Sequence, residues 1–510
     1  MVLDRLHDEL KIEALQHGYC LRPLYCRRSI IDRKKNWRDL ANVALCSRHY
    51  HTLATPILYS SLPTWRVASF LPTILCKPEL ARYVQHVIGN YISSLRYDCE
   101  PVQDAWEHER YHDAIRVFWV GIQNLLEKGC VDNSLRCRWL ETIFDDSGAI
   151  LGWTPDAGSW DSVWAILLLL FPNLSSFYMN EYTEGLDPDL HNDEEMPGKL
   201  EFIPFVVAQA AKLQLSGMAS EYSLSNLRRV KIRMHPNSEL VSPISLRPLF
   251  QLPSIRHVFL PSAIEAGHTV DINNGENDTP NTPLSQATHL QMPLADLHSR
   301  TLARFLNGFG HLTHLTYMHG DYREYCNHAS LGGQPFIPAT IHASLLHLKS
   351  SLQELTLRDD RDDYLLTRPE ECPVAPLGSL IEFRCLRRLD VTACVLLGRG
   401  DCAPEEILPA EYAASALRLF AEGLPESLER LGLRSCVRHV YAAVEMLLDR
   451  RRMGGLRRLR CLELSFQNRF TLEEVLAFEQ GEKCVVLGGE LGLRIERGVD
   501  GERLVAVPEV

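Results

Sequence analysis

The sequence lacks the features that would identify a membrane, secreted or redox-active protein. Its longest strongly apolar run, Val163–Phe171, is far shorter than the roughly 20 residues that a membrane-spanning helix needs. The charged start, MVLDRLHDELK, has no apolar signal core. The 15 cysteines are odd in number and include no CxxC pair, which argues against a disulfide framework, a zinc ribbon or a thioredoxin-like motif. Scattered, unpaired cysteines suit the reducing cytoplasm or nucleus, where we expect the protein. The net charge of −12 gives no attraction to nucleic acid or acidic lipid, so we expect binding to neither nucleic acid nor membrane.

Catalytic motifs are almost as scarce. The sequence contains no GxSxG elbow, no GxxxxGK[ST] phosphate loop and no GxGxxG after a strand. One formal zinc-peptidase motif, HExxH, occurs at residues 108–112. However, Ile115 and Phe118 stand where a metzincin continuation needs a glycine and a third ligand, and Arg110 places a charge between the histidines. A solvated helix face is the favoured interpretation and a zinc peptidase a remote alternative, so we predict no enzyme, no catalytic residue, no metal ligand and no cofactor.

A short pattern, apolar-x-x-apolar-x-apolar, recurs nine times. Two of its clearest copies end in Cys394 and Cys436, which we expect to pack inward. The pattern is the signature of a leucine-rich repeat, in which a short strand turns into a helix and neighbouring units stack to bury their apolar sides. We therefore predict an α/β fold, a leucine-rich-repeat solenoid or horseshoe that binds a ligand. The copies begin at Leu174, Leu227, Ile255, Ala287, Leu312, Leu352, Leu386, Leu428 and Leu459.

The chain divides into four predicted parts: a helical domain over 1–62, a helical linker and cap over 63–170, the repeats over 171–470, and a C-terminal cap over 471–510. Within the first part, the apolar spacing of residues 37–59 predicts one helix. We expect Asp39 to cap its start and Pro56 to mark its end.

The N-terminal part also carries a family resemblance. Residues 39–59, DLANVALCSRHYHTLATPILY, resemble the second half of an F-box as found in fungal F-box/leucine-rich-repeat proteins. Residues 70–84, FLPTILCKPELARYV, are similar to the helix that follows the box in that family, and residues 424–431, LPESLERL, to a stretch of its repeats.

This resemblance implies a non-catalytic substrate-recognition subunit of an SCF-type cullin–RING ubiquitin ligase, acting in the ubiquitin-like conjugation pathway. The helical domain would dock on the Skp adaptor, and the repeats would hold a target protein. A repeat scaffold without a ligase role is the alternative, favoured by Leu6-His7, because the family motif opens with Leu-Pro. The residues that match the apolar positions of the family motif, and would contact the adaptor, are Leu6, Leu10, Leu40, Val43 and Cys46.

The repeat register predicts which side chains face a ligand. If the first, fourth and sixth residues of each copy (offsets 0, 3 and 5) point into the core, then offsets 2, 4 and 6 line the concave surface, because side chains alternate along a strand. Those positions hold seven arginines and lysines against three acidic residues, a net charge of +4. Such a surface favours an acidic or phosphorylated protein segment, although the alternative remains that exposed strand positions are simply polar. The predicted substrate-binding residues are Arg229, Lys231, Arg233, Arg388, Arg430 and Arg434.

Overall fold

A computed structural model of the chain separates into two compact units. Unit 1 comprises residues 1–241 and 248–255, and unit 2 comprises residues 242–247 and 256–510. The structure describes residues 30–63, 67–89, 120–124, 126–127, 133–143, 160–180, 202–217, 224–233, 246–261, 263, 285–320, 336–359, 376–397, 420–436, 440–467, 470–499 and 505–506.

Unit 1 starts with two helices, α2 (Ile30–Cys46) and α3 (Arg48–Tyr59), where the sequence analysis expects one. The chain breaks at Ser47, whose extended backbone and side-chain oxygen cap α3 by accepting a hydrogen bond from the Tyr50 N–H at 3.2 Å. Both predicted boundaries are therefore wrong, since Asp39 lies inside α2 and Pro56 inside α3.

Four parallel strands follow in chain order in unit 1. Their register is continuous, pairing Ser61 with His86, His86 with Ser176 and Ser176 with Arg229. The strands are β1 (Ser61–Pro63), β2 (His86–Gly89), β3 (Ser176–Asn180) and β4 (Arg229–Arg233). The helical elements are α4 (Val67–Cys76), η3 (Pro78–Tyr83), α8 (Asn133–Ile143), α9 (Trp160–Leu170), α10 (Phe202–Leu215) and α11 (Arg247–Phe250). The first residue of α11, Arg247, is assigned to unit 2 and the rest of the helix to unit 1. Strand pairing thus begins before residue 171, within segments for which the sequence analysis expects helices.

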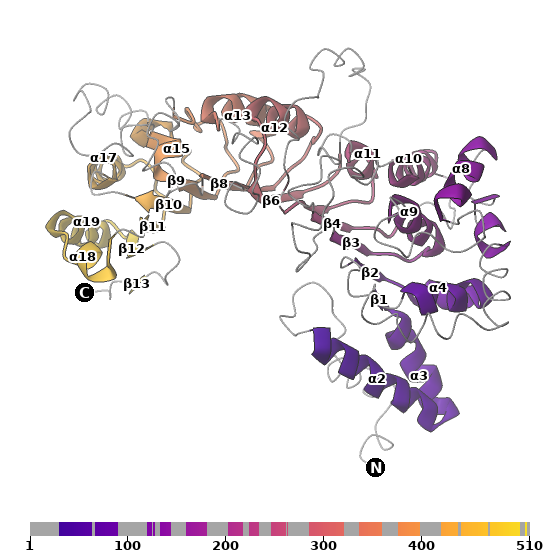
Figure 1. The fold of residues 1–510 in the computed structure, drawn as a ribbon. Coiled ribbons are helices and arrows are strands. Elements are labelled where there is room, and N and C mark those ends of the chain that lie inside the picture. The colour runs from indigo at the N-terminus through magenta and orange to yellow at the C-terminus, as the bar shows by residue number, and fades with distance from the viewer. Residues whose placement is uncertain are drawn as a thin grey trace, which may run out of the picture. The chain divides into compact units, whose positions relative to one another are not determined.

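Unit 2 continues the same architecture, with β5 to β12 paired in parallel and β13 antiparallel to β12. Its helices lie on one side of its strands (Figure 1). The strands are β5 (His257–Phe259), β6 (His289–Ala295), β7 (His314–His319), β8 (Glu354–Asp359), β9 (Arg388–Thr392), β10 (Arg430–Cys436), β11 (Cys461–Phe466), β12 (Arg494–Val499) and β13 (Val505–Ala506). The helical elements are α12 (Ser299–Leu306), α13 (Pro338–Leu345), η8 (Leu346–Leu348), α15 (Ala393–Leu397), α17 (Val440–Arg452), α18 (Leu472–Leu476) and α19 (Glu479–Glu490).

The repeat register predicts the core correctly. In all nine copies the side chains at offsets 0, 3 and 5 are buried, from Leu174, Phe177 and Met179 to the fully buried Leu464. Cys394 and Cys436 are buried as well, 2% and 0% exposed. Each repeat therefore contributes three apolar side chains to the core of its unit, and burial of a leucine-sized side chain contributes about 1.5–3 kcal/mol. Among the described residues, no helix has the length and apolar character that crossing a bilayer requires.

Two consecutive arginines in the last turn of α17 form hydrogen bonds that connect neighbouring repeats. Arg450 donates to the carbonyls of Ala421 and Leu424, the latter at 3.1 Å, in the repeat before it. Arg451 donates to the carbonyls of the following turn and of the end of α19. The acceptors of Arg451 are Leu456 and Leu459 at 2.7 Å, Leu491 at 2.8 Å and Gly492 at 3.3 Å.

Candidate functional site

The face of each sheet formed by offsets 2, 4 and 6, here called the polar face, is only partly exposed. Arg229, Arg388 and Arg430 are exposed at offset 2. By contrast, Glu463 and Thr392 are 3% and 1% exposed, although the sequence analysis expects both to line the surface. The reason lies in contacts between neighbouring strands, which cover these side chains.

A network of ion pairs runs across the polar face of unit 2. Asp390 of β9 accepts hydrogen bonds from Arg358 of β8 and Arg434 of β10, with shortest distances of 2.9 Å for both. Arg434 also donates to Glu463 of β11 at 3.2 Å, and Arg430 pairs with the same carboxylate. The three acidic residues at offsets 2, 4 and 6 of the nine copies, Glu354, Asp390 and Glu463, therefore all contact arginines of adjacent repeats.

Three of the predicted substrate-binding residues belong to this network of ion pairs. Arg430 and Arg434 bind Glu463, and Arg388 lies 3.2 Å from Glu354 of β8. The hydrogen bond with Glu463 raises the pKa of the Arg430 guanidinium further above its ordinary value. These arginines balance acidic side chains within the sheet, so the polar face of unit 2 is close to neutral where the sequence analysis expects a basic surface.

The polar face of unit 1 carries the remaining predicted basic residues. Arg229 and Lys231 lie two residues apart on β4, and the Lys231 ammonium lies 4.3 Å from the centre of the Tyr178 ring on β3. His86 of β2 is beside them, and its pKa is lowered by burial and by the charge of Arg229. Its Nδ1 lies 2.7 Å from the Ser176 hydroxyl. The described side chains at offsets 2 and 4 of β2–β4 include no carboxylate, so Arg229 and Lys231 form a basic cluster beside His86. The Arg233 side chain lies outside the described part.

A row of histidines occupies offset 2 of β5, β6 and β7 in unit 2. His257, His289 and His314 are paired in direct register, with ring centroids 4.2 Å and 4.0 Å apart. Burial, followed by the neighbouring rings of His257 and His314, lowers the pKa of His289 to about 4. These residues stand at offset 2, which the sequence analysis expects to face a ligand, but it assigns them no role, because the alignment of separate repeats becomes evident only in three dimensions.

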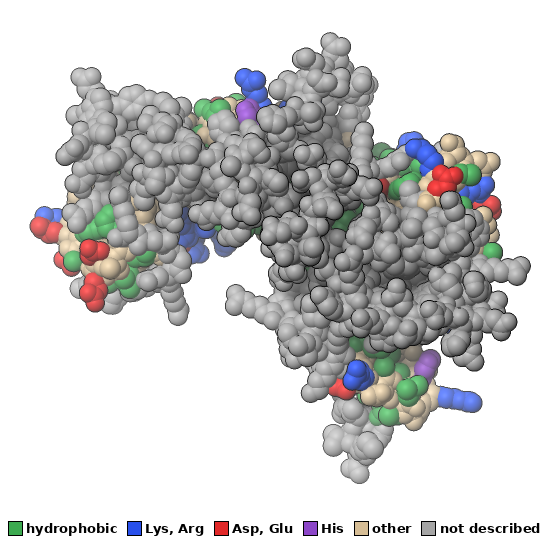
Figure 2. All heavy atoms as spheres, viewed as in Figure 1, with side chains coloured by type: hydrophobic (Ala, Val, Ile, Leu, Met, Phe, Trp, Pro, Cys, Tyr) green, Lys and Arg blue, Asp and Glu red, His purple; other side chains and the backbone are tan. Residues whose placement is uncertain are grey.

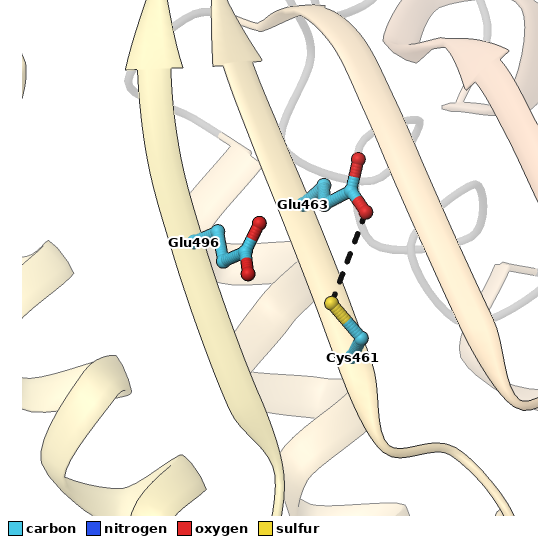
Figure 3. A group of neighbouring side chains, drawn as sticks. All are labelled: Cys461, Glu463 and Glu496. Atoms are coloured by element: carbon cyan, nitrogen blue, oxygen red, sulfur yellow. Dashed lines mark hydrogen bonds between the residues drawn. The ribbon is translucent and has the colours of Figure 1, made fainter. Parts of the chain in front are cut away.

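One group of described side chains has three potential metal ligands close together. Cys461 and Glu463 project from β11 and Glu496 from β12 on the same side of the sheet (Figure 3). The cluster is poorly suited to a cation, because Arg430 and Arg434 bind Glu463 and Arg494 lies 2.5 Å from Glu496. Burial and the two carboxylates raise the pKa of the Cys461 thiol to about 11, so the thiol stays protonated at neutral pH.

The predicted adaptor-binding residues have different environments. Leu40 is fully buried in the core between α2 and α3, and Val43 packs partly against this core. Cys46 is exposed, with its thiol donating to the Asn42 carbonyl at 3.3 Å. Leu45, which the sequence analysis did not select, is 81% exposed. Leu6, Leu10 and the HExxH motif at 108–112 lie outside the described residues.

Comparison with known proteins identifies the repeat region. A family model described as a leucine-rich repeat domain matches residues 216–448, which include seven complete predicted copies, from Leu227 to Leu428. No curated protein matches the chain. Leucine-rich repeats are typically non-catalytic modules that bind other proteins. The chain thus contains a leucine-rich repeat domain, and its fold indicates protein–protein interaction.

Proposed function

We propose that the protein is the substrate-recognition subunit of an SCF-type cullin–RING ubiquitin ligase, in the cytoplasm or nucleus. The observation that carries the proposal is a pair of packed helices, α2 and α3, followed directly by β1 in a chain that contains a leucine-rich repeat domain at residues 216–448. The sequence of the helix pair resembles the second half of an F-box. The protein performs no chemistry itself; it raises the local concentration of a target beside the ubiquitin-conjugating enzyme.

On the adaptor side, the helix pair offers an apolar edge at the end of α2. Leu40, Ala44 and Ala54 form the interior of the helix pair together with residues of α3. Leu45 and Cys46 face outward, and hydrophobic side chains are visible among polar ones over the N-terminal helices (Figure 2). Leu40 therefore supports the helix pair from inside, while Leu45, Cys46 and the partly covered Val43 contact the Skp adaptor.

On the substrate side, the basic cluster of unit 1 is the favoured contact. Arg229 and Lys231 face the same side of β4, and Arg229 forms no ion pair with any described residue. A guanidinium pairs with a carboxylate or a phosphate through two hydrogen bonds. The substrate segment is therefore acidic or phosphorylated. Arg388, Arg430 and Arg434 instead hold the sheet together.

The adaptor contact is tested by co-purification of the full chain with the Skp adaptor. Leu45→Glu puts a charge into the proposed interface without entering the core, so we expect recovery of the adaptor to fall at least tenfold. Met453→Glu is the matched control, because Met453 is also 81% exposed but follows α17. Equal adaptor recovery with both variants would show that the adaptor does not bind through Leu45. No recovery with the wild type would leave the repeat scaffold without a ligase role as the better explanation.

The substrate contact is tested by affinity capture and mass spectrometry. The double variant Arg229→Glu, Lys231→Glu reverses the cluster and should lose the acidic or phosphorylated proteins that the wild type captures. Lys212→Glu with Arg300→Glu is the control, since it changes the net charge equally at exposed helical positions. If both double variants capture the same proteins as the wild type, the substrate does not bind through this cluster.

A further inference from the structure

Leu294 of β6 holds a backbone conformation that side chains other than glycine rarely adopt. A bulge between Met292 and Ala295 shifts the register of β6 against β7, and Leu294 lies within it. Its φ of 55° is in the left-handed region, where the Cβ atom of an L-residue comes close to the following carbonyl oxygen. Asparagine or aspartate can offset this cost by a local hydrogen bond, but leucine cannot. For stability alone, leucine is therefore an unfavourable residue at this position.

A second bulge in unit 2 shows that the conformation does not require leucine. In β10 the register shifts between Leu433 and Cys436, and Ser435 takes the left-handed position with a φ of 52°. Ser435 is 9% exposed, whereas Leu294 is 46% exposed. Leu294 thus combines a strained backbone with an apolar side chain that the fold leaves half in water. Strain that packing does not explain is typical of positions that serve binding.

The polar-face positions beside Leu294 carry no ionisable side chain. Offsets 4 and 6 of the adjacent strands β5, β6 and β7 hold no aspartate, glutamate, lysine or arginine, whereas the same offsets of β9 to β11 hold Asp390, Arg434 and Glu463. One of the described side chains at these positions of β5–β7 is exposed and four are half-buried. Together with Leu294 they are here called the neutral surface, and they are the exposed Gln291 and the half-buried Phe259, Pro293, Thr316 and Met318.

We infer that the neutral surface, with Leu294 as its anchor, binds a protein segment whose contacting side chains are aliphatic or aromatic and uncharged. A charged side chain brought against these positions would lose water without gaining a partner of opposite charge. An apolar side chain instead gains free energy, because it removes the exposed parts of Leu294, Phe259 and Met318 from water together with its own surface. The absence of ionisable groups therefore selects the chemistry of the partner.

This inference does not depend on the proposed ligase role. It is tested by panning a phage-displayed library of random peptides on the immobilised full chain, where we expect enrichment of uncharged peptides rich in aliphatic and aromatic residues. A synthetic peptide of the enriched sequence, followed by fluorescence anisotropy, should bind no more weakly at about 1 M than at about 0.1 M NaCl, because salt screens only charges. Leu294→Asn should weaken this binding at least tenfold without lowering the melting temperature, since asparagine tolerates the left-handed backbone. Val486→Asn is the control, because Val486 is a 60% exposed apolar residue of α19.

A second variant tests the neutral surface without touching the strained backbone. Gln291→Glu places a charge on an exposed position among the apolar side chains, so the fold should be unaffected and peptide binding should fall at least threefold. Gln353→Glu is the matched control, because Gln353 is also exposed but lies directly before β8, outside the neutral surface.

Three results would overturn the inference. If no uncharged peptide is enriched, or if Leu294→Asn and Gln291→Glu bind the peptide as tightly as the wild type, the neutral surface is not a binding site. If the enriched peptides are acidic and are lost with Arg229→Glu, Lys231→Glu, the chain binds through the basic cluster of unit 1 instead. If Leu294→Asn lowers the melting temperature, Leu294 serves the fold and is no anchor. Failure of adaptor recovery, by contrast, would leave this inference untouched.

Discussion

Arg358 and Asp390 form a two-point ion pair between neighbouring repeats, with Nε to Oδ1 and Nη2 to Oδ2 both at 2.9 Å. Arg434 reaches the same carboxylate from the other side, also at 2.9 Å. One aspartate on β9 thus links β8 to β10. Because both arginines donate to this one carboxylate, the network should respond strongly to changes at Asp390.

The first prediction is that Asp390→Asn lowers the free energy of unfolding by about 2–3 kcal/mol. The change removes charge-assisted hydrogen bonds and leaves two partly buried guanidinium groups without their common acceptor. Urea unfolding of both proteins gives the difference. Glu382→Gln serves as the control, since Glu382 pairs with Lys349 at 2.6 Å at an exposed position and should cause no measurable change.

The second prediction is that the difference in unfolding free energy between the wild type and Asp390→Asn depends on pH. Burial on its own would raise the pKa of Asp390, but the hydrogen bonds and charges of Arg358 and Arg434 outweigh burial and hold this pKa below its usual range. The folded protein therefore binds this proton more weakly than the unfolded chain. The stabilisation is complete above the unfolded pKa of about 3.9 and is lost as pH falls through the folded pKa. We expect the gap between wild type and Asp390→Asn to shrink as pH falls from 5 to 3; a constant gap would contradict this assignment.

The third prediction is that Arg451→Lys costs about 2 kcal/mol of unfolding free energy. Lysine keeps the charge but cannot form the fork of hydrogen bonds that Arg451 makes to four backbone carbonyls. Arg452→Lys, one residue further on, should have almost no effect, because Arg452 forms an exposed ion pair with Asp449. Chemical denaturation measures both variants, and equal losses would show that the packing of the α17 end matters more than these bonds.

The fourth prediction contrasts two glycines in α19. A Cβ atom at Gly481 would lie 2.5 Å from Arg497 Nη1 and from the Tyr441 hydroxyl, whereas no other atom lies within 4 Å of a Cβ at Gly489. Gly481→Ala should therefore lower the melting temperature. Gly489→Ala should raise it slightly, because alanine favours the helix by about 0.5–1 kcal/mol. Thermal melts should therefore show changes in melting temperature of opposite sign for the two variants. If Gly481→Ala leaves the melting temperature unchanged, the Arg497 side chain moves aside without cost.

The fifth prediction is selective labelling of cysteines. Cys46, Cys76 and Cys137 are exposed, while Cys394 and Cys436 are buried. Burial also raises the pKa of the Cys484 thiol to about 11, so little reactive thiolate forms at neutral pH. Iodoacetamide at pH 7.5 should modify Cys46, Cys76 and Cys137 within minutes and leave Cys394, Cys436 and Cys484 intact until denaturant is added, as peptide mass spectrometry will show.

Much of the fold follows from the spacing of apolar residues alone. Leu386, Leu389 and Val391 illustrate the reason: side chains alternate along a strand, so one correct register determines the buried positions of the whole copy. The same register predicted burial of Cys394. Strands without the full pattern were missed, such as β2 and β12, because only their neighbours in the sheet reveal them.

The polar face was less predictable because its contacts join separate repeats. Arg434 and Asp390 are 44 residues apart, and a count of charges at surface positions does not reveal that they pair. The stacking of His289 on His314 is hidden for the same reason. At the N-terminus, the family resemblance indicated apolar positions but not exposure, so it selected the buried Leu40 and omitted the exposed Leu45.

The short strand β13 has a consequence for self-association. A sheet of parallel strands ends in backbone donors and acceptors that another chain can extend, and such free edges promote polymerisation. Here Val505 and Ala506 lie antiparallel against Arg497 and Glu496, covering the middle of β12 with a strand of the opposite direction. A second copy arriving at this edge cannot repeat the parallel pairing there. Two residues therefore protect the end of a long ladder from fibre-like growth.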